Sequence, residues 1–146
     1  MQDKAHMRAS FASIGLPQPR WKVITSVSEI ETYPVILKAI SGGYDGRGVR
    51  LTTNQMEAQE ALEKWGSALA EELISFDREL SIMIARSPHD QVSTWVVTET
   101  VQRDGICTET ISPAPNLSDA TAFSAQQIAM SIAQHIGLVG VMAVEL

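Results

Sequence analysis

A glycine-rich stretch, Ser41–Gly48, contains the residue types of this sequence that are best suited to chemistry, since four of its eight residues are glycine. Glycine lets the backbone adopt positive φ and approach a ligand closely. Backbone amides beside the amine of Lys38 and the guanidinium of Arg47 would suit phosphate oxygens. The spacing from Gly43 to Gly48 fits neither the P-loop, which needs Lys-Ser/Thr next, nor the dinucleotide fingerprint. The pattern therefore leaves open a phosphate-binding loop and a flexible hairpin.

The composition limits the class of protein. The chain has 146 residues, 45% of them apolar, which suffices for one domain with a sizeable core or for two small lobes. Its formal net charge of −6, with no basic run longer than two residues, argues against nucleic acid or an anionic membrane as the main partner. No stretch has the character of a transmembrane span or a signal peptide, and the single cysteine, Cys107, is compatible with a reducing cytosol. We therefore expect a cytoplasmic globular protein.

Hydrophobic periodicity predicts the elements that must position the glycine-rich stretch. The apolar run over 35–38 predicts a buried strand that ends in Lys38, and residues 49–52 predict the returning strand. A helix is expected over 54–65, with Asn54 as its N-cap. The other elements expected in this half are a helix over 3–14, a strand over 21–24, a short helix over 26–33 and an apolar segment over 68–74.

The second half is expected to form a further sheet and one long helix. Residues 78–86 alternate between apolar and polar, as in a half-buried strand. Asp104-Gly105 is a strong turn signal and predicts a hairpin between strands over 91–102 and 106–111. The remaining elements are a helix over 118–136 and a final strand over 139–146.

Several motifs support a resemblance when they are taken together. They are Gln2-Asp-Lys4 opening a helix, Lys38 shortly before S-G-G-Y-D-G-R-G, the run Ala70–Glu79, the hairpin Gln102–Ile106 and the closing strand Gly140–Glu145. The chain resembles the ATP-grasp enzymes over essentially all 146 residues, and most closely the 5-(carboxyamino)imidazole ribonucleotide synthases. The string G-G-Y-D-G-R-G is the most specific part, because other ATP-grasp carboxylating enzymes look richer in glycine there and lack the Tyr-Asp pair.

The resemblance implies an α/β (α+β) fold, in which an ATP-grasp lid lobe is followed by the beginning of the C-terminal ATP-grasp lobe. Both would consist of mostly antiparallel sheets with helices packed on them. Residues 1–16 would lead into the lid, 17–87 would form the lid subdomain, and 88–146 would begin the large subdomain, with a seam near Ser87–Asp90. A strand that runs to the last residue predicts a fragment, without the family's N-terminal Rossmann-like lobe and its second acidic metal ligand.

The activity that the resemblance implies is that of an ATP-dependent carbon–nitrogen ligase of de novo purine (IMP) biosynthesis. Bicarbonate would attack the γ-phosphate of ATP to give carboxyphosphate, and 5-aminoimidazole ribonucleotide would then be carboxylated. The expected partners are ATP, bicarbonate and the ribonucleotide, with Mg²⁺ as the metal and a homodimeric parent enzyme. The fragment alone is expected to be inactive.

Two alternatives to this activity stay open. One is a different ATP-grasp carboxylase or ligase, such as a biotin carboxylase or a formate-dependent glycinamide ribonucleotide transformylase. The Tyr44-Asp45 pair argues against it. The other is a nucleotide-binding module without turnover.

The resemblance also implies roles for individual residues. The expected catalytic residues, facing the ribonucleotide and the bicarbonate-derived intermediate, are Tyr44, Asp45 and Arg47. The expected nucleotide-binding residues are Lys38, Gly43, Gly46, Gly48, Val49, Glu71, Glu72, Leu73, Ile74, Glu79 and Gln102. The expected Mg²⁺ ligand is Glu145, a hard oxygen donor.

Within this set the ligand groups are divided as follows. Lys38 would contact an α- or β-phosphate, and the glycines would cover the β- and γ-phosphates. Residues 71–74 would bind adenine, and whether Glu71 or Glu72 faces the nucleotide stays open. The carboxylate of Glu79 would accept hydrogen bonds from the ribose hydroxyls. The ordinary alternatives are a solvated strand-end lysine and exposed strand carboxylates.

Overall fold

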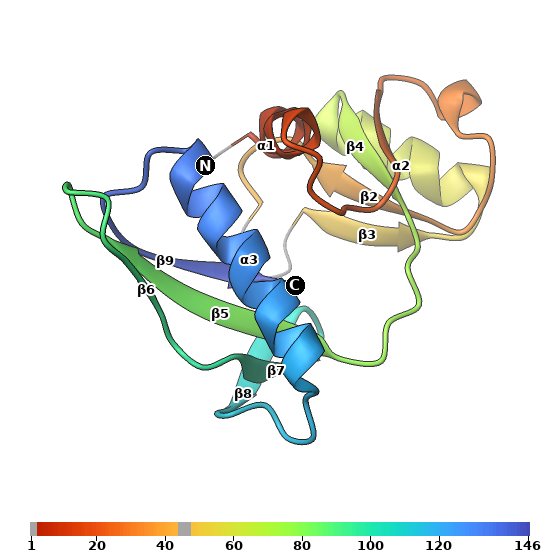
Figure 1. Ribbon diagram of the computed structural model, residues 1–146. Coiled ribbons are helices and arrows are strands. Elements are labelled where there is room, and N and C mark those ends of the chain that lie inside the picture. Colours follow the sequence, from red (N-terminus) through yellow and green to blue (C-terminus); the bar gives the residue numbers. More distant parts are fainter. Residues whose placement is uncertain (1–2, 44–47) are drawn as a thin grey trace. The chain divides into compact units, whose positions relative to one another are not determined.

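The computed structural model describes residues 3–43 and 48–146 and divides into two compact units, Met1–Ser75 and Phe76–Leu146 (Figure 1). All of the strand pairs described in the two units are antiparallel. The expected catalytic residues Tyr44, Asp45 and Arg47, and the expected phosphate-binding Gly46, lie outside the described residues. Over the described ranges, no helix combines the length and apolar character needed to cross a bilayer.

The first unit is built on a four-stranded sheet in the order β1-β4-β2-β3. Its strands are β1 (Trp21–Ile24), β2 (Val35–Ala39), β3 (Val49–Thr52) and β4 (Ala68–Glu72). Its helices are α1 (Lys4–Ser13), the short 3₁₀ helix η1 (Val27–Glu29) and α2 (Gln55–Trp65). The strands β2 and β3 flank the glycine-rich stretch, as the sequence predicts.

Helix α2 covers one face of this sheet. Asn54 caps its N-terminus by accepting a hydrogen bond from the backbone N–H of Glu57. Gly66, at φ +73°, ends the helix in a backbone conformation that few other residues adopt. The buried face of α2 joins the core formed with the strands, whose buried members are Ile24, Val35, Leu37, Ala58, Ala61, Leu62 and Ala68. The amphipathic pattern of residues 54–65 is therefore confirmed.

The opposite face of the sheet carries different side chains, because successive residues of a strand point to opposite sides. On β4, Ala68 belongs to the core under α2, whereas Leu69 and Glu71 point the other way and are also buried. Helix α1 contributes to covering this second face, since Arg8 contacts the side chain of Glu71. The backbone N–H of Lys4 donates to the carbonyl of Ile40, which ties the start of α1 to the end of β2.

The second unit is organised around β5 (Glu79–Arg86). The strand β9 (Gly140–Glu145) pairs along one edge of β5, from Ser81 to Arg86. The other edge is shared by β7 (Thr98–Arg103) near the start of β5 and by β6 (Val92–Thr94) near its end. The strand β8 (Ile106–Ile111) forms a hairpin with β7.

Helix α3 (Asp119–His135) packs on β5, as Figure 1 shows. Its buried residues are Ala125, Ala129, Ile132 and Ala133. They match the apolar face expected for the helix over 118–136. The buried residues of β5 are Leu80, Ile82 and Ile84, so Glu79 and Ser81 belong to the opposite face.

Two elements differ from the expectation. The helix expected over 26–33 is only the single turn of η1, which begins with a capping box between Ser26 and Glu29. The strand expected over 91–102 is broken into β6 and β7. The break allows the two parts to pair with different segments of β5, and at the break the N–H of Trp95 donates to the carbonyl of Met83.

The division of the chain also differs from the expected boundary at residue 87. The two units divide between Ser75 and Phe76, so β5 belongs to the second unit. The physical reason is its pairing, since β5 bonds to β6, β7 and β9. Residues 87–90 form a turn within the second sheet, where the N–H of Asp90 donates to the carbonyl of Ser87.

Leu37→Ala should lower the free energy of unfolding by about 2–5 kcal/mol, because it leaves a cavity in the core under α2. Leu37 is fully buried, at 0% exposure. Leu51→Ala, on the neighbouring strand, is the matched control, since Leu51 is 50% exposed. Urea unfolding followed by circular dichroism measures both. An equal loss in the two variants would contradict this description of the core.

Candidate functional site

Three charged side chains from different elements meet in the first unit. A carboxylate oxygen of Glu71 on β4, Oε1, lies 2.6 Å from Nε of Arg8 on α1. Its other oxygen, Oε2, lies 2.6 Å from Nζ of Lys38 on β2. The Glu71 side chain is only 4% exposed, against 16% for Arg8 and 26% for Lys38. We call these three residues the Glu71 cluster.

The strand register explains why Lys38 and Glu71 meet. Ile36 lies opposite Glu71, and Lys38 lies opposite Leu69. Lys38 and Glu71 are therefore diagonal neighbours on one face of the sheet, within reach of long side chains. The register also settles which of the two glutamates is buried, since the side chain of Glu71 joins this cluster.

The cluster controls the ionisation of its carboxylate. Burial of Glu71 raises its pKa, because it disfavours the charged form. Hydrogen bonds from Arg8 and Lys38, together with their positive charges, outweigh burial and hold the pKa below its ordinary value. Glu71 is therefore ionised at neutral pH and keeps two cations beside it.

Glu72 has a different environment. Its carboxylate accepts hydrogen bonds from the backbone N–H and from Nε of Arg20, both at 2.7 Å. The Arg20 side chain is 90% exposed, so this pair lies at the surface. Leu73 and Ile74 follow the end of β4 and are 47% and 44% exposed. Of the four residues expected to bind adenine, only Glu71 is buried.

The base of the glycine-rich stretch is closed by backbone contacts. The N–H of Ala39 donates to the carbonyl of Gly48 at 2.8 Å. Gly48 has φ +84°, and a Cβ there would lie 3.1 Å from Cα of Gly43 and 3.2 Å from Cβ of Ala39. Only glycine fits this close approach without a shift of the backbone. Lys38 directly precedes this closed base.

Lys4 also lies at this end of β2, although it was given no role among the expected binding residues. Its Nζ donates to the carbonyl of Ala39 at 3.1 Å. Lys4 and Arg8 share one face of α1 because they are four residues apart. In the sequence, this i, i+4 spacing places two cations on one face of a helix but does not show which residues they contact.

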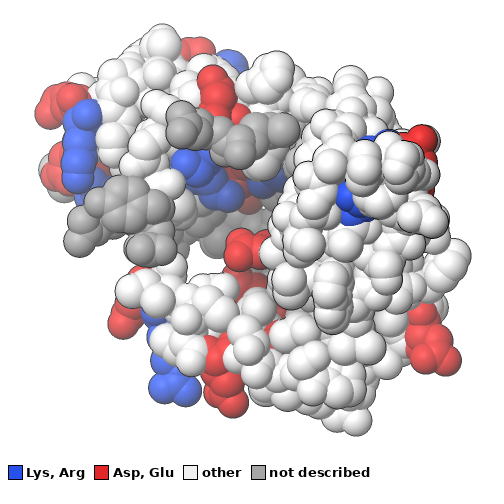
Figure 2. Space-filling view, turned by 90° about the vertical axis from the view of Figure 1, so that its left-hand side faces the viewer, with Lys and Arg blue, Asp and Glu red and all other residues white. Residues whose placement is uncertain are grey.

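Positive charge on one face of the molecule is dispersed. Figure 2 shows lysine and arginine side chains in small separate groups on one face, among a majority of uncharged residues. Any anion recognition on this face therefore depends on individual cations and not on a broad basic surface.

Two expected binding residues come together in the second unit. Glu79 and Ser81 share a face of β5, and Ser81 lies opposite Glu145 on β9. The carboxylates of Glu79 and Glu145 therefore belong to the face of this sheet opposite the buried Leu80. Gln102 lies on β7, opposite Cys107 and next to an irregularity in the β7–β8 register.

A complete magnesium site is not formed by the residues that the structure describes. No group of three or more His, Cys, Asp or Glu side chains there could hold a metal ion. Mg²⁺ is commonly held by one or two carboxylates together with substrate phosphates. Glu145 is exposed and provides one such carboxylate.

The fold and the Glu71 cluster can now be compared with known proteins. The ATP-grasp domain family matches residues 9–146. The chain belongs to the ATP-grasp family. The resemblance seen in the sequence, and with it the expected mixture of antiparallel sheets and helices, is confirmed.

Within this family the chain is similar to N5-carboxyaminoimidazole ribonucleotide synthases. It is 43% identical over 155 residues to the enzyme of that name from Mycobacterium tuberculosis, covering 99% of this chain and 36% of that protein. The chain therefore spans little more than a third of the length of this relative.

Solved structures give the same picture. N5-carboxyaminoimidazole synthase from Aspergillus clavatus, in complex with ADP and 5-aminoimidazole ribonucleotide, is 28% identical, with a TM-score of 0.83. That match covers 99% of this chain and 39% of the other. A pyruvate carboxylase from Rhizobium etli is 26% identical, with a TM-score of 0.85, and covers 99% of this chain and 14% of the other.

Acid should remove the stability that the Glu71 cluster provides. Because the pKa of Glu71 is lowered in the folded state, its contribution is fully present above the ordinary glutamate pKa and is lost as the pH falls through the folded value. Glu71→Gln should therefore be less stable than the unsubstituted protein at pH 7, and the difference should shrink with acid. Urea unfolding over a pH series measures this.

The control is Glu63→Gln, on α2, where the carboxylate accepts a hydrogen bond from Gln59. Its difference from the unsubstituted protein should stay small at every pH. A Glu71→Gln difference that is constant with pH would contradict the pairing described here.

Proposed function

We propose that this chain is the lid and an adjoining part of an ATP-dependent carbon–nitrogen ligase that carboxylates 5-aminoimidazole ribonucleotide with bicarbonate. The observation that carries the proposal is the position of Lys38 next to the closed base of the glycine-rich stretch. The similarity to N5-carboxyaminoimidazole ribonucleotide synthases supports the choice of substrate.

The first part of the proposal is phosphate binding by the first unit. Phosphoryl transfer needs little covalent chemistry from the protein and depends on positioning and on neutralising charge. Lys38 would supply a positive charge to an α- or β-phosphate oxygen. Gly43, Gly46 and Gly48 would bring backbone N–H groups near the β- and γ-phosphates, with Val49 beside them.

The second part concerns the carboxylation. Tyr44, Asp45 and Arg47 would face the ribonucleotide and the carboxyphosphate derived from bicarbonate. A guanidinium offers paired donors that suit either anion. Exclusion of water by this segment would protect an unstable acyl phosphate from hydrolysis.

The third part assigns the remaining nucleotide contacts. Leu73 and Ile74 would contact adenine through exposed aliphatic side chains, and their backbone groups, with those of Glu71 and Glu72, would meet the base edge. The carboxylate of Glu79 would accept hydrogen bonds from the ribose hydroxyls, and Gln102 would lie near the nucleotide. Mg²⁺, when bound, would neutralise phosphate charge, and Glu145 would be one of its ligands. We also propose a cytoplasmic location and a homodimeric enzyme.

A second candidate is a biotin-dependent carboxylase, because a pyruvate carboxylase shares the fold at 26% identity. The Tyr44-Asp45 pair and the higher identity to the imidazole ribonucleotide enzymes favour the first candidate. A nucleotide-binding role without turnover remains the simplest alternative for these 146 residues alone.

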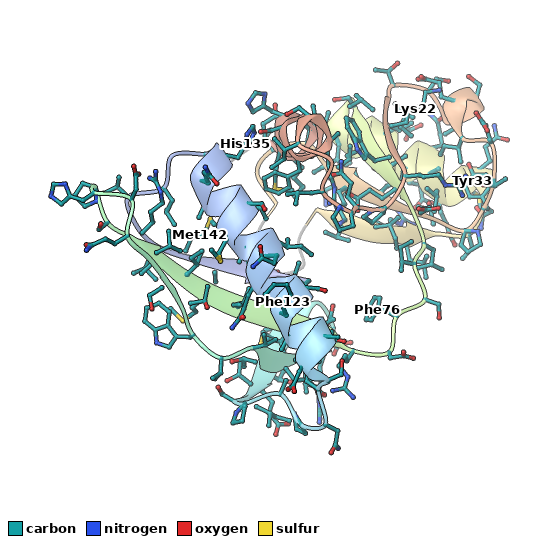
Figure 3. All side chains as sticks on the ribbon, viewed as in Figure 1. Lys22, Tyr33, Phe76, Phe123, His135 and Met142 are labelled. Carbon is teal, nitrogen blue, oxygen red and sulfur yellow. The ribbon has the colours of Figure 1, made fainter. Side chains whose placement is uncertain are left out.

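Lys38→Met should weaken ATP binding, because it removes a charged donor from the phosphates. A hydrogen bond to a charged group contributes about 1.5–3 kcal/mol, which corresponds to a rise in Kd of roughly 10- to 100-fold. Isothermal titration calorimetry with Mg-ATP, in an enzyme of the relatives' length that contains this chain, measures the change. The control is Lys22→Met on β1 of the same unit (Figure 3), where Lys22 lies 3.7 Å from a carboxylate oxygen of Glu29. Equal affinity in both variants would remove Lys38 from the proposed site.

The substrate is tested in an enzyme of the relatives' length that contains this chain. ATP hydrolysis should require both bicarbonate and 5-aminoimidazole ribonucleotide, because carboxyphosphate forms from the first and is consumed by the second. Phosphate release, measured with each compound omitted in turn, checks this. Turnover with biotin in place of the ribonucleotide would favour the second candidate.

A further inference from the structure

The Glu71 cluster holds one carboxylate between two cations that use different oxygens. Arg8 contacts Oε1, and Lys38 contacts Oε2, each at 2.6 Å. Either cation can move away from Glu71 while the other keeps its contact. The two contacts can therefore be made and broken separately.

This separation bears on phosphate binding by Lys38. If Lys38 were the only partner of Glu71, its movement to a phosphate would leave a buried carboxylate unpaired, which is strongly unfavourable. With Arg8 still on Oε1, the Glu71 side chain, at 4% exposure, keeps a partner. The presence of Arg8 thus makes the release of Lys38 easier.

The two cations differ in how firmly they are held. Arg8 lies within α1, where its backbone carbonyl accepts a hydrogen bond from Nε2 of Gln18, and its side chain is 16% exposed. Lys38 is next to the last residue of β2 and is 26% exposed. The flexible side chain of a lysine lets its amine move between partners more readily than the planar guanidinium of an arginine can. Lys38 is therefore the cation suited to move.

We propose that Arg8 is a positioning residue for nucleotide binding, which keeps the Glu71 carboxylate paired so that Lys38 can move from Glu71 to a phosphate oxygen. This inference rests on the proposed function, since it requires that Lys38 binds phosphate. This role does not require Arg8 itself to contact phosphate or adenine.

Arg8→Met tests the proposal with two measurements. The first is the rate at which acetic anhydride acylates the Lys38 amine, followed by mass spectrometry with Lys22 as internal reference. The variant should lower this rate several-fold, because Lys38 becomes the only cation on a buried carboxylate. A role of Arg8 limited to fastening α1 would give an unchanged or higher rate, since a loosened helix exposes Lys38.

The second measurement is the Kd for Mg-ATP, by calorimetry in an enzyme of the relatives' length that contains this chain. Arg8→Met should raise it roughly tenfold, within the usual range of coupling between two sites. Arg8→Lys, which keeps a cation at the position, should recover most of the affinity. Arg20→Met is the matched control, because it breaks the surface pair with Glu72, the next residue of β4. It should change neither the Kd nor the acylation of Lys38.

The outcomes separate this inference from the proposed function. Slower acylation of Lys38 together with weaker ATP binding supports the inference. Unchanged or faster acylation in Arg8→Met, in a protein that binds ATP, overturns the inference and leaves the proposed function in place. Failure of the unsubstituted enzyme, in a chain of the relatives' length, to bind ATP overturns the proposed phosphate binding, and the inference falls with it.

Discussion

The arrangement of the first unit depends on one buried negative charge. Glu71 points away from the core under α2 and is nonetheless almost completely covered. A carboxylate can be buried in this way only when cations compensate for the loss of water. Glu71 therefore fixes where α1 and the end of β2 must lie, because each of them brings one of the two cations. A single residue thus links the packing of the unit to the position of its candidate phosphate-binding lysine.

The same end of β2 collects several further constraints. Lys4 contacts the carbonyl of Ala39 through its amine and the carbonyl of Ile40 through its backbone N–H. Gly48 closes the base of the glycine-rich stretch from the other side, against Ala39 and Gly43. Contacts made by Lys4 and Gly48 therefore fix the backbone at the end of β2, next to Lys38.

Local signals in the sequence were sufficient for most of the fold. Asn54 caps α2 as expected, and Asp3 caps α1 in the same way, because an N-cap depends only on residues within the next turn. The turn at Asp104-Gly105 forms with both residues at positive φ, as its composition requires. The apolar faces of α2 and α3 follow from periodicity alone.

The features that the sequence did not predict depend on distant contacts. The burial of Glu71 and not Glu72 follows from the face of β4 that α1 helps to cover. The role of Arg8 could not be inferred, because its partner is 63 positions away in the chain. The two units divide between Ser75 and Phe76 for the same reason, since β5 pairs with strands that come later in the chain. The roles expected for Tyr44, Asp45 and Arg47 fall outside the described residues and stay predictions.

The pairing of β5 with β9 has a consequence for synthesis on the ribosome. In chain order, β5 is the first and β9 the last strand of this sheet. The backbone of Ser81 can therefore pair with Glu145 only after Glu145 has been synthesised. Until then, one edge of a strand rich in isoleucine and leucine remains open to any other extended chain. Newly made copies are therefore most vulnerable to intermolecular association during the interval in which α3 and β9 are still being translated.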